Sequence, residues 1–352
     1  MVQSESTEVS GPLVNRRGWL IGLLLVIALA AIVYAFAFRG PAANEKSRLQ
    51  PVVINQAFEH LLYLGLYVAK DKGLFEKEGL DVRIDTGGGD DKAFAALASG
   101  SAQFAQGDPA FVAIARQRGW DGRVIAMAVD RVAIWGLAKD PAIKPFTDPS
   151  GFRGRRVATY PNPNTAYVVQ RELLQRAGLR EGRDSQIVQV AFGSELAALQ
   201  RGQVDIAQTI EPNVSAHEVA GGTVAFSYPE AWGPLAFTGV MTSQKFIEQQ
   251  PQTVQAFLNA YEKALVYIHE NRAGALEVAQ RRLPDIPQAT LERALNRLIA
   301  SGSFPAHAAV DPASWRSLLE VRVKVGDLPS VPRETLFDNR FAQKAATSPS
   351  SR

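Results

Sequence analysis

The sequence predicts an α/β protein built from two similar lobes, and three observations lead to this prediction. The line AALASGSAQFAQ, which starts at Ala95, returns without a gap as AALQRGQVDIAQ at Ala197, 102 positions later. Strand-like apolar stretches alternate with stretches of helical spacing in both halves of the chain. The length of 352 residues suits about two domains. Strands separated by helices of this length pair in parallel through right-handed crossovers.

The first half contains a complete set of such elements. We expect strands at 52–55, 80–85, 102–106, 123–129 and 132–138. The stretch 61–75 is expected to form a helix that ends at Gly73. A second helix begins at Asp90, which caps it, and stops at Gly100. Asp108-Pro109 then opens a third helix, because proline suits the first turn.

The second half repeats this order. We expect strands at 155–160, 187–192 and 204–208. Asn164 caps a helix that runs to Ala177, and Ser194 caps one that stops at Gly202. Glu211-Pro212 opens the next helix. The repeated line therefore marks the same unit in each half, namely a helix, a glycine stop, a strand and an acid–proline helix start.

The pattern changes beyond Ala236, where one strand at 235–242 is followed mostly by helices. A helix that starts at Pro251 carries an apolar stripe, typical of a core face, at Phe257, Leu258, Tyr261, Leu265 and Ile268. We expect these helices to pack back on the first lobe. The predicted parts are a first lobe at 51–140 plus 236–345, a second lobe at 141–235, crossing segments near 139–148 and 228–236, and a disordered tail at 346–352.

The N-terminal region predicts a membrane anchor. Residues 18–38 carry no charge and, at about 1.5 Å per residue, form a helix of roughly 31 Å, enough to cross a bilayer. A cleaved signal peptide is the alternative, but the run is longer than a usual signal segment. Arg16 and Arg17 place residues 1–17 in the cytoplasm. Residues 39–50 then form a linker, and the lobes lie on the extracytoplasmic (periplasmic) face of a bacterial inner membrane.

Composition excludes several classes of function. The net charge is +3 with no basic stripe, so nucleic acid is not an expected partner. The chain has no cysteine, which excludes disulfides, thiolate metal sites and cysteine nucleophiles. Its four histidines, His60, His217, His269 and His307, show no metal-binding spacing. We expect no cofactor, no metal and no catalytic residues.

Two facing lobes predict a binding cleft, because ligands lie beyond the carboxyl ends of parallel strands, where helices start. Aromatic side chains there suit stacking, and Glu211 is expected to accept hydrogen bonds from the ligand. The run Gly87–Gly89 lacks the lysine of a phosphate loop, and a permissive turn is the alternative. The candidate ligand-binding residues are Asn55, Phe58, Glu59, His60, Tyr63, Gly88, Gly89, Asp90, Gly107, Asp108, Tyr160, Asn162, Asn164, Thr165, Glu211 and Trp232.

Four segments carry a resemblance to a known family. INQAFEHLLYLGLYVAKDKGLFEKEGLDVRI, GGGDDKAFAALASGSAQFA, GDPAFVAIARQRG and TGVMTSQKFIEQQPQTVQAFLNAYEKALVYIHEN occur in family order between about 52 and 325. They resemble the substrate-binding proteins of ABC importers for thiamine-precursor pyrimidines, sulfonates, taurine and nitrate. The resemblance implies the periplasmic-binding-protein type II fold, hinge closure around a small organic solute, and delivery to a permease with its ATPase. We expect a monomer.

The resemblance leaves the ligand open. Asn55 and GLYVA (65–69) resemble the pyrimidine branch, but that branch has a histidine where this chain has Tyr63. GDP at 107–109 resembles the sulfonate and nitrate branch instead. Two other functions stay open as alternatives, an enzyme on the same fold, similar to pyrimidine-precursor synthases, and a solute sensor.

Overall fold

The structure is a computed structural model that describes residues 49–347. The predicted anchor at 18–38, the cytoplasmic segment 1–17 and residues 348–352 lie outside the described residues. Among residues 49–347, no helix has the length and apolar character that crossing a membrane requires.

Two five-stranded sheets form the framework, and their strand orders match. The first sheet contains, in spatial order, β2 (Leu80–Thr86), β1 (Gln50–Gln56), β3 (Phe104–Gly107), β10 (Pro234–Ser243) and β4 (Gly122–Arg131). The second contains β7 (Gln186–Gln189), β6 (Arg156–Thr159), β8 (Ile206–Thr209), β5 (Trp135–Ala138) and β9 (Thr223–Ser227). The predicted α/β class with two similar halves is confirmed.

Both sheets are mixed, which corrects the expectation of parallel pairing throughout. β10 runs antiparallel to β3 and β4, and β5 runs antiparallel to β8 and β9. Each of these strands follows the crossing from the other sheet, so it enters in the opposite direction. The first crossing lies at 132–134 rather than at 139–148. The predicted boundary at 140/141 is therefore misplaced, because β5 belongs to the second sheet.

The repeated sequence line occupies the same place in each sheet. In the first copy α4 (Asp90–Ala98) precedes β3 and α5 (Ala110–Arg116), and in the second α7 (Glu195–Gln200) precedes β8 and α8 (Asn213–Val219). β3 lies between parallel β1 and antiparallel β10, as β8 lies between parallel β6 and antiparallel β5. Gly100 and Gly202 both have positive φ, at 80° and 69°. The duplication predicted from the sequence is confirmed.

The remaining helices cover the sheets and depart from the prediction in two places. The stripe on α11 (Pro251–Glu270) is buried as expected. The predicted helix begins later than expected, as α2 (Leu64–Asp71) after a 3-10 turn (Leu61–Tyr63). The stop predicted at Gly73 is confirmed, because Gly73 has a φ of 66° and α3 (Leu74–Lys77) begins after it. The expected tail begins too early, since α15 (Arg340–Thr347) is helical to its end. The others are α6 (Thr165–Arg176), α9 (Tyr228–Trp232), α10 (Gln244–Gln249), α12 (Arg272–Arg282), α13 (Gln288–Ala300) and α14 (Pro312–Lys324).

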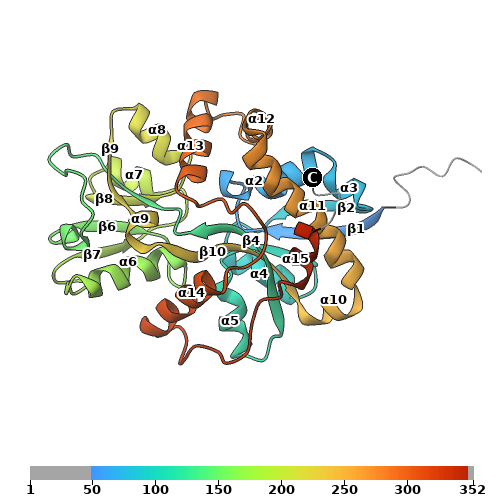
Figure 1. Cartoon of the computed structure of the whole chain (residues 1–352). Helices are drawn as coiled ribbons and strands as arrows, with labels where there is room; N and C mark the ends of the chain where they lie inside the picture. The colour runs from blue at the N-terminus through green and yellow to red at the C-terminus, as the bar shows by residue number, and fades with distance from the viewer. Residues whose placement is uncertain (1–48, 348–352) are drawn as a thin grey trace, which may run out of the picture. The chain divides into compact units, whose positions relative to one another are not determined.

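Two C-terminal helices reach the helices of the second sheet. α13 contacts α8, and α14 contacts α6 as well as β10 of the first sheet. Figure 1 shows these contacts on two different sides of the second sheet. Each of these helices carries an arginine that pairs with the carboxylate of an acid–proline helix start, Arg297 with Glu211 and Arg322 with Asp108.

Replacing either stop glycine should destabilise the fold to a similar extent. Gly100→Ala and Gly202→Ala should each lower the free energy of unfolding by about 1–2 kcal/mol, because a Cβ strains a left-handed backbone. A Cβ added at either position would meet no other atom within 4 Å, so crowding adds nothing. Urea unfolding measures the loss. Gly202→Asn is the control and should cost less, since asparagine tolerates this conformation; an alanine variant as stable as the parent would contradict the assignment.

Candidate functional site

A cavity lies between the two sheets. Its lining comes from both, namely Phe58, His60, Leu62, Tyr63, Asp90, Asp108, Tyr160, Asn164, Thr165, Phe192, Ile210, Phe237 and Thr238. The free volume is only about 40 Å³, room for a few water molecules. A second cavity of about 370 Å³ shares Phe58, Asp90, Tyr160, Asn164 and Phe192 with it. The two together form the cleft.

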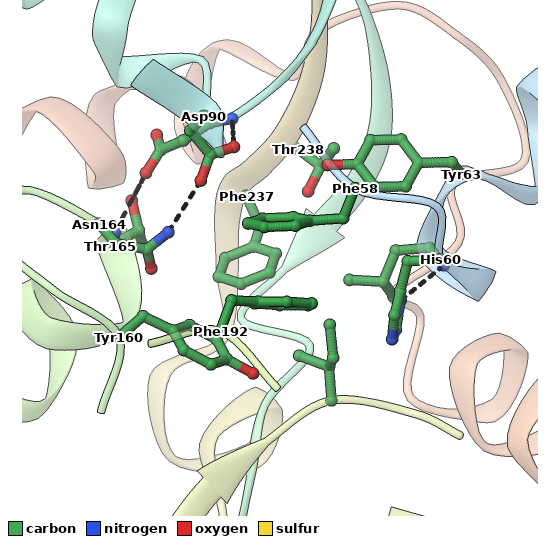
Figure 2. A pocket seen from close by; sticks show the side chains of 13 residues that line it. Phe58, His60, Tyr63, Asp90, Tyr160, Asn164, Thr165, Phe192, Phe237 and Thr238 are labelled. Atoms are coloured by element: carbon green, nitrogen blue, oxygen red, sulfur yellow. Dashed lines mark hydrogen bonds between the residues drawn. The ribbon is translucent and has the colours of Figure 1, made fainter. Parts of the chain in front are cut away.

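Two phenylalanines from opposite sides close the cleft at its centre. Phe58 follows β1 and Phe192 follows β7, so they belong to different sheets. Their rings are stacked with centroids 3.7 Å apart and an angle of 13° between planes. Tyr160 packs obliquely on Phe192. Figure 2 shows the two stacked rings between a polar group at Asp90, Asn164 and Thr165 and the imidazole of His60.

A cluster of buried polar side chains also joins the two sides. We call Asp90, Asp108, Asn164, Thr165 and Arg322 the polar latch. Asp108 Oδ2 accepts hydrogen bonds from the Thr165 backbone N (3.0 Å), from Thr165 Oγ1 (2.6 Å) and from Arg322 Nη2 (2.8 Å). Asp108 follows β3, Thr165 starts α6 and Arg322 lies on α14. The latch therefore connects the first sheet, the second sheet and a C-terminal helix.

Asp90 extends the latch and is close to its protonation midpoint at neutral pH. Its Oδ1 accepts from the Asp108 backbone N (2.9 Å) and its Oδ2 from Asn164 Nδ2 (2.9 Å). Burial, followed by the negative charge of Asp108, raises the pKa of Asp90 to about 7. Gly107 makes room for it, because a Cβ there would lie 2.6 Å from Asp90 Oδ1. Asp90 is thus the first residue of α4 and not the helix cap that the sequence predicted.

His60 is uncharged in this environment. Its Nδ1 accepts a hydrogen bond from Leu62 N (3.3 Å), which leaves the proton of the neutral ring on Nε2. Burial lowers the pKa of His60 to about 3. Within residues 49–347, neither cavity has a lysine or arginine in its lining. The cleft therefore offers carboxylates and aromatic faces, and no exposed cation.

At the helix starts that were expected to face the ligand, backbone N–H groups donate to acceptors of the protein itself. Asp108 Oδ1 accepts from Ala110 N at α5, and Asn164 Oδ1 accepts from Ala166 N at α6. In the glycine run, the N–H groups of Gly88 and Gly89 both donate to the Ala57 carbonyl. These backbone donors are occupied, which supports the turn interpretation of Gly87–Gly89 over phosphate binding.

The predicted site residues fall into three groups. Eight line the inner cavity: Phe58, His60, Tyr63, Asp90, Asp108, Tyr160, Asn164 and Thr165. Three more line only the larger one: Gly88, Gly89 and Asn162. Five line neither: Asn55, Glu59, Gly107, Glu211 and Trp232. Contact of the first two groups with a solute stays a prediction.

Glu211 and Trp232 correct the sequence-based prediction. Glu211 is fully buried and lines neither cavity, and its carboxylate accepts from Ser215 N, Ser215 Oγ and Arg297 Nε at 2.7–2.9 Å, so its partners are groups of the protein itself. Trp232 donates to Ser317 Oγ of α14, and the guanidinium of Arg176 lies 4.0 Å from its ring centroid. Both residues join elements outside the cleft.

Two important residues were missed. Phe192 ends the predicted strand 187–192, where a cleft residue is expected, but its role depends on Phe58 from the other side. Arg322 is fully buried, on the same face of α14 as Trp315, Leu318 and Leu319. An arginine in an apolar stripe at helical spacing is the signal that could have revealed it, because a buried charge needs a buried partner.

The whole-chain similarities agree with this architecture. The sequence profile described as NMT1/THI5-like matches residues 62–275, which is more than half of the chain. The chain belongs to the NMT1/THI5-like family. One relative is the riboflavin-binding protein RibY of Chloroflexus aurantiacus, 24% identical over 298 residues that cover 81% of this chain and 83% of RibY.

Solved structures show the fold that this chain shares with other proteins. The ligand-binding component of an ABC-type import system from Staphylococcus aureus aligns with a TM-score of 0.70 at 12% identity, covering 85% of this chain and 100% of that one. The alkanesulfonate-binding protein SsuA of Xanthomonas axonopodis aligns with a TM-score of 0.61 at 21% identity, covering 84% and 97%. The desulfurization enzyme DSZB also has this fold, so the fold alone does not separate binding from catalysis.

Removing the Glu211 carboxylate should weaken the fold and leave the cleft unaffected. Glu211→Ala leaves the Ser215 N–H and Arg297 without their buried partner, so the free energy of unfolding should fall by about 1–3 kcal/mol in urea. Glu218→Ala is the control. Glu218 also pairs with Arg297, but 29% of its side chain is exposed, so its loss should cost less than about 1 kcal/mol. Equal stability of both variants would contradict this role of Glu211.

The stability of the fold should depend on pH through Asp90. Because its pKa is raised from 3.8 to about 7, the folded protein holds a proton between these values that the unfolded chain has lost. The contribution of Asp90 is therefore greatest below pH 4 and is lost as pH rises to about 7. Asp90→Asn should remove this part of the dependence of the melting temperature on pH.

Asp130→Asn provides the matched control for Asp90. Burial raises the pKa of Asp130 to about 6, and this residue lies outside both cavities. Replacing Asp130 should change the dependence of the melting temperature on pH only below about pH 6. The fall in melting temperature toward pH 7, which Asp90 causes, should remain. Parallel profiles for the parent protein and Asp90→Asn between pH 5 and 8 would refute a raised pKa at Asp90.

Proposed function

We propose that this protein is the extracytoplasmic solute-binding component of an ABC importer and that it captures a flat nitrogen heterocycle, of the type of the thiamine-precursor pyrimidine, by closing two lobes around it. The single observation that carries this proposal is the stacked pair of Phe58 and Phe192, contributed by different sheets. A planar ring between them would contact one aromatic face from each lobe.

The geometry of the pair explains why the lobes have to move. Face-to-face rings at 3.7 Å leave no room between them, and the inner cavity is too small for an organic solute. An inserted ring would bring the centroids of Phe58 and Phe192 to about twice their present separation, given the normal contact distance of carbon atoms. Opening and closing about the two crossing segments at 132–134 and 228–233 supplies this displacement.

The polar groups around the pair favour a heterocycle over a sulfonate. The carboxyl group of Asp90 lies toward one end. It accepts two hydrogen bonds within residues 49–347, so it keeps acceptor capacity for amino or amide N–H groups of a ligand. His60 lies toward the other end, where its Nε2–H suits a ring nitrogen or carbonyl oxygen. An anion would meet the carboxyl groups of the latch, whose cation, Arg322, is already paired with Asp108 and Asp327. RibY, whose name records a flat ligand, is consistent with this preference.

The remaining parts of the proposal concern location and partners. The uncharged run at 18–38 anchors the protein in the inner membrane with the lobes outside, and a membrane permease with its ATPase accepts the solute. A tether of this kind raises the local concentration of the protein at the permease. The relatives described as binding proteins and as components of an import system support the transport role.

Binding of a heterocycle should depend on the stacked pair. In calorimetry with the purified full-length protein, the aminopyrimidine precursor of thiamine or riboflavin should bind, whereas methanesulfonate and nitrate should not. Phe192→Ala should weaken binding by about 1–3 kcal/mol, which is roughly 5- to 150-fold, because one stacking face is lost.

The control for this experiment is Phe337→Ala. Phe337 is also half-buried, packs on Trp315 and lines neither cavity, so its removal should leave the affinity unchanged. Binding of either anion without either heterocycle would overturn the proposed ligand class. Equal loss in both variants would show that Phe192 acts through stability and not through contact.

A further inference from the structure

Two consecutive residues of β10 line the same cavity, which a regular strand does not allow. Phe237 and Thr238 both line the inner cavity, whereas neighbouring side chains of a strand normally point to opposite faces of the sheet. The register explains the exception, because the four steps along β10 from Pro234 to Thr238 lie opposite only two steps along β4. A bulge of this kind re-aims a side chain, and bulges are frequent beside functional sites.

The bulge brings Thr238 to the edge of the first sheet that borders the cleft. β10 runs antiparallel to β3, and Gly239 pairs with Gly107, so Thr238 lies next to the end of β3 at Asp108. The threonine is 6% exposed. The sequence did not indicate Phe237 or Thr238 as site residues, because strict alternation along the strand would direct only one of them toward the cleft.

A second hydroxyl faces the same part of the cavity. Tyr63 belongs to the 3-10 turn that precedes α2, and Figure 2 shows its hydroxyl directed toward Thr238. Neither hydroxyl forms a hydrogen bond with the other side chains that line this cavity. Burial, followed by the negative charge of Asp90, raises the pKa of Tyr63, so the phenol keeps its proton at neutral pH and remains a donor.

The chemistry of these groups indicates which part of a solute they bind. Both hydroxyls are uncharged, and both can donate to a single acceptor atom. The carboxyl group of Asp90 lines the same cavity and keeps acceptor capacity for an N–H group. The matching ring edge has an acceptor atom beside an N–H group. An aminopyrimidine offers a ring nitrogen and an amino group in this order, and the ring system of riboflavin offers a carbonyl oxygen and a ring N–H.

We propose that Tyr63 and Thr238 are specificity-determining residues of the cleft: their two hydroxyls bind one uncharged acceptor atom, a carbonyl oxygen or a ring nitrogen, at the edge of the solute ring. This inference deepens the proposed function and rests on it for the class of solute. Stacking on Phe58 and Phe192 selects a flat molecule, and the hydroxyl pair selects the atoms along its edge. A hydrocarbon ring of the same shape is rejected, because it leaves both hydroxyls without a partner.

Removing either hydroxyl tests the inference. Calorimetry with the full-length protein measures the affinity of Tyr63→Phe and Thr238→Val for the aminopyrimidine precursor of thiamine and for riboflavin. Each substitution removes one oxygen and retains most of the side-chain shape. Each should therefore weaken the binding of the heterocycle that the parent binds by about 5- to 100-fold. The melting temperature without ligand should stay close to that of the parent.

Three further variants separate recognition from packing. Thr238→Ser keeps the hydroxyl and should retain most of the affinity. Tyr261→Phe removes another tyrosine hydroxyl, which is fully buried and lines neither cavity, so it should leave the affinity unchanged. In the double variant Tyr63→Phe/Thr238→Val the two losses should combine to less than their product, because both hydroxyls bind the same atom. Fully multiplicative losses would overturn the sharing of one atom.

The outcomes separate this inference from the proposed function. Heterocycle binding that is as tight in Tyr63→Phe and Thr238→Val as in the parent overturns the inference and leaves the proposed function standing. An equal loss in Thr238→Ser and Thr238→Val also overturns it, because the hydroxyl is then not the group that matters. Losses in the hydroxyl variants with unchanged affinity in Phe192→Ala overturn stacking between the lobes and keep the hydroxyl pair. If the parent binds neither heterocycle, both proposals are overturned.

Discussion

The closed arrangement of this protein depends on one carboxylate oxygen. Asp108 follows a strand of the first sheet. Its Oδ2 accepts hydrogen bonds from Thr165, the first residue of α6 beside the second sheet, and from Arg322 on α14. A charged group that is 4% exposed is tolerated only when its partners neutralise and saturate it, and all of these partners meet here. The distance between the lobes, and with it the stacking of Phe58 on Phe192, follows from this constraint.

Because of the duplication, the protein has two equivalent ion pairs, each between an acid–proline helix start and a C-terminal helix. Each repeated unit ends in an acid–proline pair, Asp108-Pro109 and Glu211-Pro212, and each carboxylate pairs with an arginine from a C-terminal helix, Arg322 of α14 or Arg297 of α13. The two pairs lie on different sides of the second sheet, as the positions of α13 and α14 indicate. Only the first pair borders the cavity, and this difference separates a residue of the binding site from one of the framework.

The sequence predicts features whose partners are close in the chain, and it misses those whose partners are far apart in the chain. Asn164 was identified as a helix cap because its partner, Ala166, is two positions away, and the repeat at Gly100 and Gly202 is visible in the letters themselves. Arg322 was missed because its partner Asp108 lies 214 positions away. The direction of β5 and β10 escaped prediction for the same reason, since strand polarity depends on which sheet a crossing segment joins. The prediction that Glu211 faces the cleft rests on its place at a strand end. Nothing near it in the sequence shows that its partner is Arg297 on α13.

The stacked phenylalanines have a consequence for how tightly any guest is held. Phe58 and Phe192 already stack on each other, so a solute that inserts between them replaces an existing ring-to-ring contact. The net gain is the difference between two guest–ring contacts and one ring–ring contact. A molecule with a single usable face gains nothing over the direct contact between the two rings, while one with two opposite faces gains a full contact. The stacking of Phe58 on Phe192 therefore favours solutes that are planar on both sides.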